Sequence, residues 1–391
     1  MSGRRVVLAG CLVGSLVLAG CATFAPQPPP ESWRPPDSFT PQAGPEPQVP
    51  GEGTAPQDGA QDQAAPTSVP PPDGCTDFHP AVIATCLNPV AAVAALPGDG
   101  SDPVALVAER TTGRILRVRK NTEPVVVATL PVDTGTDGGL TGVALSPNFL
   151  EDRLIFAYIT TATDNRLVRI APGDTPKPVL TGIPRGATGN RGALGLDHRG
   201  ALLLATGDAG NPAAPLDPNS LAGKVLRLSA AGKPAEDNPV KDSAVVASGL
   251  HAPGGVCASL DGSRIWLTDR DERRDLLFRL QYGRPLGEPA WTWPDRPGIT
   301  GCASTPDTVW VTASVAANLQ GLPLAADGTF RGKPQITLQN QDGFGRLSGI
   351  DLINQSVAVA GTVNKDGGTP VSSDDRAVVI VPAGGPGGSV D

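Results

Sequence analysis

The sequence predicts an all-β fold, a six-bladed β-propeller that follows a signal peptide and a disordered Pro-rich tether. Three observations predict the propeller. Short runs of Val, Leu and Ile alternate with Gly-rich turns, little of the chain has helical periodicity, and the same order of strand-like segments recurs six times at about 50 residues. Because a propeller blade has four short strands, six repeats of this length indicate six blades, whereas a β-sandwich would not repeat six times.

The N-terminus is typical of an export signal. Two arginines precede an apolar run over residues 6–18, which is too short to span a membrane. The run ends in "LAGC", Leu18–Cys21, which resembles the lipobox of bacterial lipoproteins, whereas the same letters at Leu8–Cys11 follow the arginines too closely. We therefore expect residues 1–20 to be a lipoprotein signal peptide and Cys21 to carry the lipid. This places the protein at the extracytoplasmic face of the cell membrane.

The rest of the chain divides by composition. Residues 21–73 contain runs such as "PQPPPESWRPP" and "SVPPPDG", and their few apolar side chains cannot form a core, so we expect a disordered tether. The propeller is expected over residues 74–385, and a flexible tail over residues 386–391.

Each predicted blade has the same order of segments. An inner strand is followed by a second strand, a third strand with a central arginine, and a fourth strand such as "PVVVATL" or "KPVLTGI". The last blade is one strand short, and "AVIATCL", Ala81–Leu87, is expected to close the ring. We expect the arginines to be structural, with their stems over a neighbouring side chain and their heads in water. They are Arg117, Arg169, Arg227 and Arg279.

Four cysteines belong to the predicted propeller. An even number in an exported protein predicts disulfides, and four cysteines allow three pairings. We expect Cys75–Cys86, which closes a local loop, and Cys257–Cys302, because both residues occupy equivalent positions of neighbouring inner strands. The chain has no CxxC motif and only 3 histidines, which disfavours a metal site built from Cys or His.

The charge limits the partners. The net charge is −8, of which the tether supplies part, and no basic patch of the kind that binds nucleic acid is present. We expect no nucleic-acid partner. The expected partners are the membrane, through the lipid, and either a small sugar-like molecule or an envelope protein, with the propeller as a monomer.

The stretch "ATGDAGNPAAPLDPNSLAGKVLRL", Ala205–Leu228, carries the longest insertion of the repeat. In a propeller this loop opens on the face where the inner strands start, so polar side chains are expected to converge there on an axial funnel. Asp208 and Asn211 are also candidate ligands for a hard cation such as calcium. The alternative is that the polar loop residues cap turns. The candidate ligand- or cofactor-binding residues are Asp137, Arg191, Asp208, Asn211, Asn219, Lys224, His251 and Arg346.

Three segments, "GLTGVALSPNF", "ATGDAGNPAAPLDPNSLAGKVLRLSAAGKP" and "GLHAPGGVCASLDGSRIWLTD", resemble the glucose/sorbosone dehydrogenase family, the soluble quinoprotein aldose dehydrogenases. The resemblance runs from about Val90 to Ala383. It implies a six-bladed propeller, pyrroloquinoline quinone (PQQ) in the funnel with calcium near it, and oxidation of an aldose to a lactone.

Two motifs depart from that family. The family's catalytic base is a histidine in "HxGGxL", and here "GNRGAL" places Gly189 at its position, while His198 is expected on the opposite face. The family's "HRNPQG" reads "LHAPGG", so His251 and Ala252 replace the arginine and asparagine that would hold the quinone. Since glycine cannot accept a proton and a general base is worth roughly 10²–10⁴-fold in rate, the resemblance implies a kept fold with edited chemistry.

Three functions are compatible with the sequence. The first is an envelope-anchored propeller that binds a carbohydrate-like or protein ligand without quinone chemistry. The second is an active PQQ-dependent aldose dehydrogenase in which His251 is a displaced base. The third is a lactonase-type propeller with a metal ion, which needs an inward glutamate, and Glu109 and Glu272 are its few candidates.

Overall fold

The computed structural model describes residues 69–381. The predicted signal peptide, Cys21, most of the tether and the tail lie outside the described residues. Within residues 69–381, the helices are too short or too polar to span a membrane.

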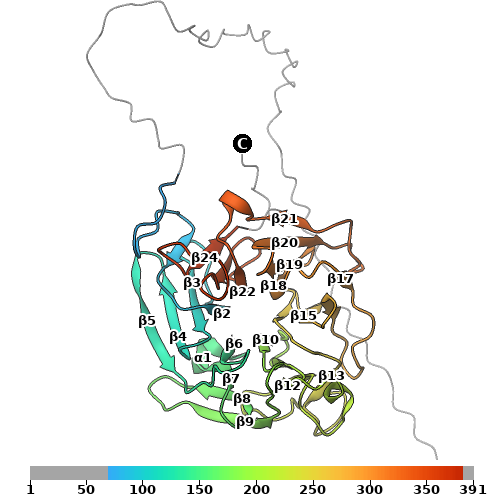
Figure 1. Cartoon of the computed structure of the whole chain (residues 1–391). Coiled ribbons are helices and arrows are strands. Elements are labelled where there is room, and N and C mark those ends of the chain that lie inside the picture. Colours follow the sequence, from blue (N-terminus) through green and yellow to red (C-terminus); the bar gives the residue numbers. More distant parts are fainter. Residues whose placement is uncertain (1–68, 382–391) are drawn as a thin grey trace, which may run out of the picture. The chain divides into compact units, whose positions relative to one another are not determined.

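The fold is the predicted six-bladed β-propeller. Six antiparallel sheets of four strands surround one axis, and each runs from an inner strand at the axis to an outer strand at the rim (Figure 1). Blades 1 to 3 consist of β2 (Val90–Ala95), β3 (Val104–Glu109), β4 (Arg114–Arg119) and β5 (Thr122–Thr129); β6 (Leu140–Leu145), β7 (Ile155–Thr160), β8 (Asn165–Ile170) and β9 (Lys177–Ile183); and β10 (Gly192–Leu196), β11 (Leu202–Thr206), β12 (Lys224–Leu228) and β13 (Val245–Ser248).

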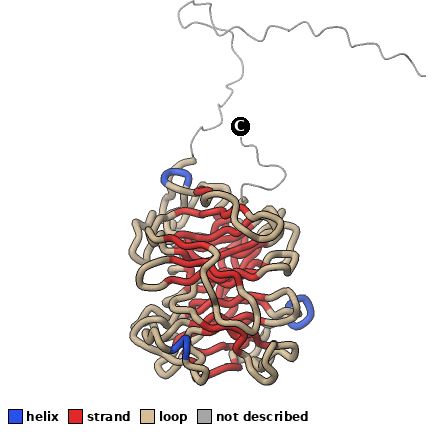
Figure 2. The backbone as a smooth tube through the Cα atoms, turned by 90° about the vertical axis from the view of Figure 1, so that its right-hand side faces the viewer, coloured by secondary structure: helices blue, strands red, loops and turns tan. Residues whose placement is uncertain are grey.

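The other three blades continue the ring, and the last one takes its outer strand from the start of the propeller. Three short helices, α1 (Phe149–Asp152), η1 (Ala214–Leu216) and η2 (Asn340–Asp342), lie in surface loops (Figure 2). Blades 4 to 6 consist of β14 (Gly255–Ala258), β15 (Ile265–Arg270), β16 (Asp275–Arg279) and β17 (Trp291–Trp293); β18 (Ile299–Ser304), β19 (Thr308–Ala313), β20 (Asn318–Pro323) and β21 (Gln335–Thr337); and β22 (Leu347–Leu352), β23 (Ala358–Thr362), β24 (Ala377–Ile380) and β1 (Val82–Ala84).

The hydrophobic core lies between neighbouring blades. Leu106 and Ile115 of blade 1 pack against Ile155 and Ile159 of blade 2, and equivalent clusters fill the other interfaces. Both faces of a blade are therefore covered, and β7 is buried at every position. This explains why the strands appear in the sequence as continuous apolar runs rather than as a strict alternation of apolar and polar residues.

Glycines let the inner strands approach one another at the axis. A Cβ atom at Gly349 would lie 2.6 Å from Ala92 Cα, and one at Gly301 would lie 2.7 Å from the Ser348 carbonyl oxygen. Real side chains do not tolerate these distances, so the Gly-rich starts of the inner strands are a packing requirement of the ring.

The middle of the axis is narrow. Residues of all six inner strands line a space of about 30 Å³ there, among them Val93, Val143, Leu194, Val256, Cys302 and Ile350. This neck lies next to a cavity of about 300 Å³ on the face where the inner strands end, and His198 lines that second cavity. His198 is thus on the face that the sequence predicted.

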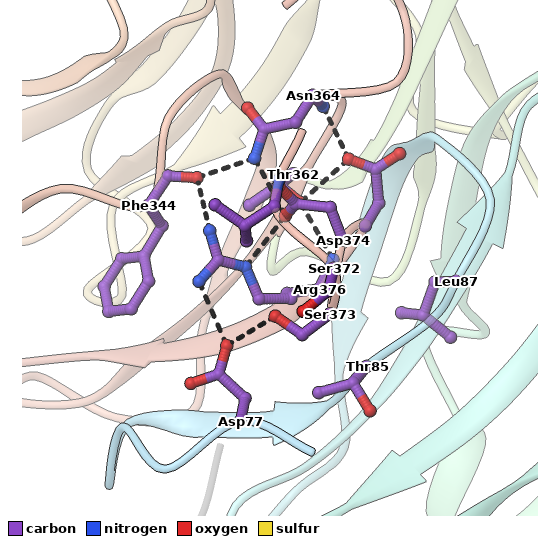
Figure 3. A network of polar contacts seen from close by, with 12 residues as sticks. Asp77, Thr85, Leu87, Phe344, Thr362, Asn364, Ser372, Ser373, Asp374 and Arg376 are labelled. Atoms are coloured by element: carbon purple, nitrogen blue, oxygen red, sulfur yellow. Dashed lines mark hydrogen bonds and ion pairs between the residues drawn. The ribbon is translucent and has the colours of Figure 1, made fainter. Parts of the chain in front are cut away.

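The ring closes where the sequence predicted, through β1 and a polar network beside it. β1 pairs antiparallel with β24, with Val82 opposite Val378. Arg376 Nε donates to Asp374 at 2.8 Å, and its Nη1 donates to Asp77 at 3.2 Å (Figure 3). Asp77 also accepts a hydrogen bond from Ser373 Oγ at 2.7 Å, so the segment before β1 is fixed to the last blade.

Both predicted disulfides are confirmed. Cys75 and Cys86 are bonded with their Cα atoms 5.4 Å apart, and Cys257 and Cys302 with their Cα atoms 5.8 Å apart. The first ties the chain before β1 to the residues after it, and the second joins the inner strands of blades 4 and 5.

One of the four repeated arginines differs from the expectation. Arg117 and Arg279 are exposed as expected, but the side chain of Arg227 is only 1% exposed. Its Nε donates to the buried Asp197 at 2.6 Å, and Nη1 pairs with Asp237. Arg227 therefore has its charge neutralised inside blade 3, and the prediction of a solvated head was wrong for this position.

Candidate functional site

A cavity of about 900 Å³ opens on the face where the inner strands begin. Its walls come from the segments before β6, β10, β14 and β18 and from the segments after β11 and β15, which all reach the same face. The lining residues are Asp137, Thr188, Gly189, Asp208, Gly210, Pro212, His251, Ala252, Arg270, Asp271, Glu272, Arg273, Arg274 and Arg296. Of the eight predicted residues, the cavity thus brings together Asp137, Asp208 and His251.

An Asp–His pair forms part of this wall. His251 Nδ1 lies 3.0 Å from Asp208 Oδ2, and the two side chains are 34% and 11% exposed. The hydrogen bond to Asp208 raises the pKa of His251 above its ordinary value, against the opposing effect of burial. Within residues 69–381, His251 Nε2 has no hydrogen-bond partner, so it is available to a ligand in the cavity.

A buried carboxylate fixes the turn that carries His251. Asp269, near the end of β15, is fully buried and accepts hydrogen bonds from the backbone N–H groups of His251, at 3.0 Å, and Ala252, at 2.7 Å. Burial raises the pKa of Asp269. Since the turn is held through backbone groups, the imidazole of His251 keeps one position against Asp208.

The position of Gly189 is closed to a side chain. Gly189 has φ +67°, and a Cβ atom there would lie 2.3 Å from Asp208 Oδ1 and 2.6 Å from the backbone nitrogen of Gly210. Its N–H donates to Asp137 Oδ2 at 3.1 Å. The carboxylate that positions His251 thus occupies the space into which a residue at position 189 would project.

Among residues 69–381, the side chains of Arg191 and Arg270 make no hydrogen bond or ion pair. Arg270 follows the buried part of β15 and lines the cavity, and its Nε is buried without a hydrogen-bond partner. Arg191 is the last residue before β10. Burial, and then the positive charges of Arg270 and Arg110, lower the pKa of Arg191.

Five of the predicted residues do not line the cavity, and Arg191, described above, is one of them. Asn211 and Asn219 are exposed and stabilise turns of the long loop, since Asn211 Oδ1 accepts from the Ala213 N–H at 3.1 Å and the Asn219 N–H donates to Asp217. Arg346 Nη1 donates to the carbonyl of Gly367 at 2.7 Å. These contacts are those of turn and loop residues.

Lys224, the fifth, supports the long loop through its backbone. It is 2% exposed, burial lowers its pKa, and its Nζ donates to the carbonyls of Ala214 and Pro215 at 3.0 and 2.7 Å. The ammonium group therefore binds the backbone of η1 rather than a ligand, and it holds the loop over the start of β12.

The sequence did not lead us to the residues at the end of β15, the second strand of blade 4. Asp269 and Arg270 follow the apolar run "IWLT", and a second strand ends on the face where the inner strands begin. Applying the rule that located the long loop to every blade would have found them. Arg296 was also missed, because it lies in the turn before β18.

Among the described residues, no group of three or more His, Cys, Asp or Glu side chains is arranged to hold an ion. Glu109 is fully buried and pairs with Arg114 at 2.7 Å, away from the cavity. Glu272 lines the cavity wall.

Comparison with known sequences gives one family and one curated relative. The sequence model of the family described as Glucose / Sorbosone dehydrogenase matches residues 88–296, just over half of the chain. The aldose sugar dehydrogenase YliI of Escherichia coli K12 is 30% identical over 175 residues, which are 40% of this chain and 47% of the relative. The match therefore spans about half the length of that relative.

Solved structures extend the similarity to about three quarters of the chain. The PQQ-bound aldose sugar dehydrogenase of Streptomyces coelicolor is 29% identical with a TM-score of 0.68, over 76% of this chain and 95% of that one. The apo form of a soluble aldose sugar dehydrogenase of Escherichia coli is 18% identical with a TM-score of 0.63, over 77% and 99%. The second similarity concerns the fold alone.

Proposed function

The chain belongs to the glucose/sorbosone dehydrogenase family, and from this we propose that it binds a sugar-like ligand in the cavity without the oxidation that its relatives' names describe. The ligand enters where the inner strands begin. It contacts the Asp208–His251 pair, and no proton is taken from it by a residue at position 189.

The single observation that carries this proposal is the closed position of Gly189. The family motif has its catalytic histidine there, and the Asp208 carboxylate occupies that space at 2.3 Å from a Cβ atom. The backbone is left-handed at this position, which favours glycine. Since the atoms around Gly189 leave no space for a side chain, position 189 provides no base in this proposal.

The residues present do not fit the family's quinone and calcium. The N–H groups of His251 and Ala252, at the motif's arginine and asparagine, point to Asp269 rather than to the cavity. Arg191 has a side chain where the motif has glycine. Among residues 69–381, the carboxylates form no metal-holding group. We derive no step through either cofactor.

The other residues that line the cavity suit a hydroxyl-rich ligand. His251 Nε2, the Thr188 hydroxyl and the Glu272 carboxylate offer donors and acceptors around one open space, and binding sites of this size use a few such groups to orient a ligand. Asp208 keeps the imidazole in place, so the pair acts as a positioned hydrogen-bonding group.

One observation favours a second candidate, PQQ-dependent oxidation with His251 as the base. An imidazole whose Nδ1 is held by a carboxylate presents Nε2 as a proton acceptor once it is neutral, and Asp208 and His251 have this geometry at 3.0 Å. The raised pKa of His251 works against this role at neutral pH, because the imidazolium accepts no proton.

The location of this activity follows from the N-terminal sequence. We propose attachment through Cys21 to the extracytoplasmic face of the membrane, supported by the apolar run and "LAGC". Cys21→Ala should release the protein from the membrane fraction and Cys11→Ala should not. Equal retention of both variants would contradict the lipid anchor.

The binding proposal is tested on the purified full-length protein with a panel of monosaccharides, by thermal shift and then calorimetry. Asp208→Ala should weaken any sugar found by about tenfold, since it removes the partner of a ligand-binding imidazole. Asn211→Ala is the matched control, because this residue lies in the same loop but outside the cavity. Equal loss in both variants, or no sugar bound by the wild type, would contradict the proposal.

A further inference from the structure

We propose that the cavity of about 300 Å³ on the face where the inner strands end, here the exit cavity, binds a small apolar amine. The alkyl part of the amine fills the cavity, and its ammonium group pairs with Asp351. The exit cavity shares no lining residue with the cavity that contains His251. The inference therefore does not rest on the proposed function.

The wall of the exit cavity is mostly aliphatic. Five of the six blades each contribute a leucine or isoleucine from the end of the inner strand or from the turn after it, and the Cys257–Cys302 disulfide extends the wall to blade 5. A cavity of this size and lining is at the lower end of the range for small-molecule sites. The five aliphatic residues are Leu96, Leu145, Leu196, Leu260 and Ile353.

These aliphatic side chains are not covered by the protein itself. Leu96, Leu196, Leu260 and Ile353 are only partly buried, whereas the apolar residues between the blades are buried. Covering apolar surface is favourable in proportion to the area removed from water. An alkyl chain in the exit cavity would cover the surface that the blades leave open.

Asp351 is the one acidic residue among the described residues that line the exit cavity. Its Oδ2 accepts from the N–H of Ala95 at 2.8 Å, and its Oδ1 accepts from the N–H of Leu352 at 2.9 Å. The first contact joins blade 6 to blade 1. The two hydrogen bonds therefore hold the carboxylate in a fixed place on the cavity wall.

The carboxylate of Asp351 has no positively charged partner. Within residues 69–381, no Arg, Lys or His side chain pairs with it. Burial raises its pKa to about 6, because an apolar environment disfavours the ionised form. At neutral pH the group is still mostly ionised, so the aliphatic wall contains a negative charge that only backbone dipoles stabilise.

This charge selects the ligand. A buried charge is stabilised by a partner of opposite sign, and an ammonium group supplies both a positive charge and three N–H donors. A carboxylate or phosphate would be repelled, and a sugar would place hydroxyl groups against aliphatic side chains. His198 also lines the cavity, and its imidazole in the cationic form would oppose the amine.

The test uses butylamine, hexylamine, 1-hexanol and hexanoate with the full-length protein at about pH 8, where free alkylamines are protonated and free carboxylic acids are ionised. Ligand-observed NMR titrations measure each Kd. Asp351→Asn removes the charge, and Asp99→Asn is its control, because Asp99 is exposed in the turn after β2. Leu260→Trp reduces the cavity, and Leu150→Trp, at an exposed position of α1, is its control.

Hexylamine should bind the wild type about tenfold more tightly than 1-hexanol, because it adds an ion pair in an apolar environment, and hexanoate should bind more weakly than 1-hexanol. It should also bind about tenfold more tightly than butylamine, since two more methylene groups are covered. Asp351→Asn should bring hexylamine to within about twofold of 1-hexanol. Leu260→Trp should weaken both ligands about tenfold, and the two controls should leave them unchanged.

Asparagine keeps an oxygen that can accept from the Ala95 N–H, so Asp351→Asn should fold. If it does not, the comparison of the three head groups on the wild type still decides the role of the charge. Equal binding of hexylamine, 1-hexanol and hexanoate would overturn that role. Absence of hexylamine binding, or hexylamine binding that Leu260→Trp leaves unchanged, would overturn the assignment of the cavity.

Discussion

His251 and Asp208 join the two loops that frame the cavity. His251 Nδ1 lies 3.0 Å from Asp208 Oδ2, and the backbone N–H of Asp208 donates to the carbonyl of His251 at 2.9 Å. The two contacts fix the long loop after β11 to the turn before β14. The same carboxylate lies against Gly189, so one residue both positions the imidazole and excludes a side chain from position 189.

The His251–Asp208 pair should make stability depend on pH. Because the folded pKa of His251 is raised, the stabilisation is complete below its unfolded value of about 6.5 and is lost as the pH rises through the folded value. Asp208→Asn should therefore cost about 0.5–1 kcal/mol more at about pH 6 than at about pH 9, a small difference because His251 is partly exposed. Urea unfolding at both pH values measures it, and an equal cost at both would contradict the ion pair.

Gly189→His should neither fold well nor restore oxidation. The left-handed backbone and the overlap with Asp208 and Gly210 should together cost more than about 3 kcal/mol. Gly173→His is the control, since Gly173 has φ +74° and no atom within 4 Å of a Cβ, and it should cost only about 1 kcal/mol. Denaturant unfolding compares the two. Equal costs would show that position 189 has room for a side chain.

Arg376→Ala should weaken the contacts that close the ring. Its side chain is 10% exposed and its partners Asp77 and Asp374 are 3% and 1% exposed, so the change leaves two buried carboxylates unpaired and should cost about 3–5 kcal/mol. Arg119→Ala, which breaks the exposed pair with Asp102, should cost less than about 1 kcal/mol. Urea titration with intrinsic fluorescence measures the free energy of unfolding of both variants. Similar losses would show that the Arg376 network does not stabilise the closure of the ring.

The two disulfides should differ in their contribution to stability. The Cys257–Cys302 bond spans 45 residues and Cys75–Cys86 spans 11, so loop entropy assigns about 4 and about 3 kcal/mol to them. Paired Cys→Ala variants of each bond, unfolded in urea, test this order. A larger loss from the shorter loop would mean that fixing the segment before β1 matters more than constraining the unfolded chain.

The architecture could be predicted because the order of strand segments in a blade repeats along the sequence. Glycine directly precedes the inner strands β6, β14 and β18, and the closing strand "AVIATCL" is the segment that blade 6 lacks. The buried state of Arg227 could not be predicted, because its partners Asp197 and Asp237 lie in turns that only the folded blade brings together. Within the described part of the chain, Arg117, Arg169 and Arg279 have no such pair of carboxylates.

The sequence predicted which face of the propeller carries the cavity, but it predicted only some of the residues that line it. Topology placed Asp137, Asp208 and His251 on one cavity wall, since all three follow or precede strands that meet there. It could not show that Lys224 turns inward to the carbonyls of η1, or that Asn211 and Asn219 serve their own turns. Those outcomes depend on the local path of a long loop, which strand periodicity does not determine.

The most direct test of the central claim is aldose oxidation by the full-length wild type with PQQ and calcium, followed by quinone absorbance and dye reduction over a sugar panel. The account predicts no sugar-dependent dye reduction, because Gly189 provides no base and the surrounding atoms leave no room for one. PQQ-dependent turnover that His251→Ala abolishes and Asn211→Ala leaves intact would contradict the account and establish His251 as the base.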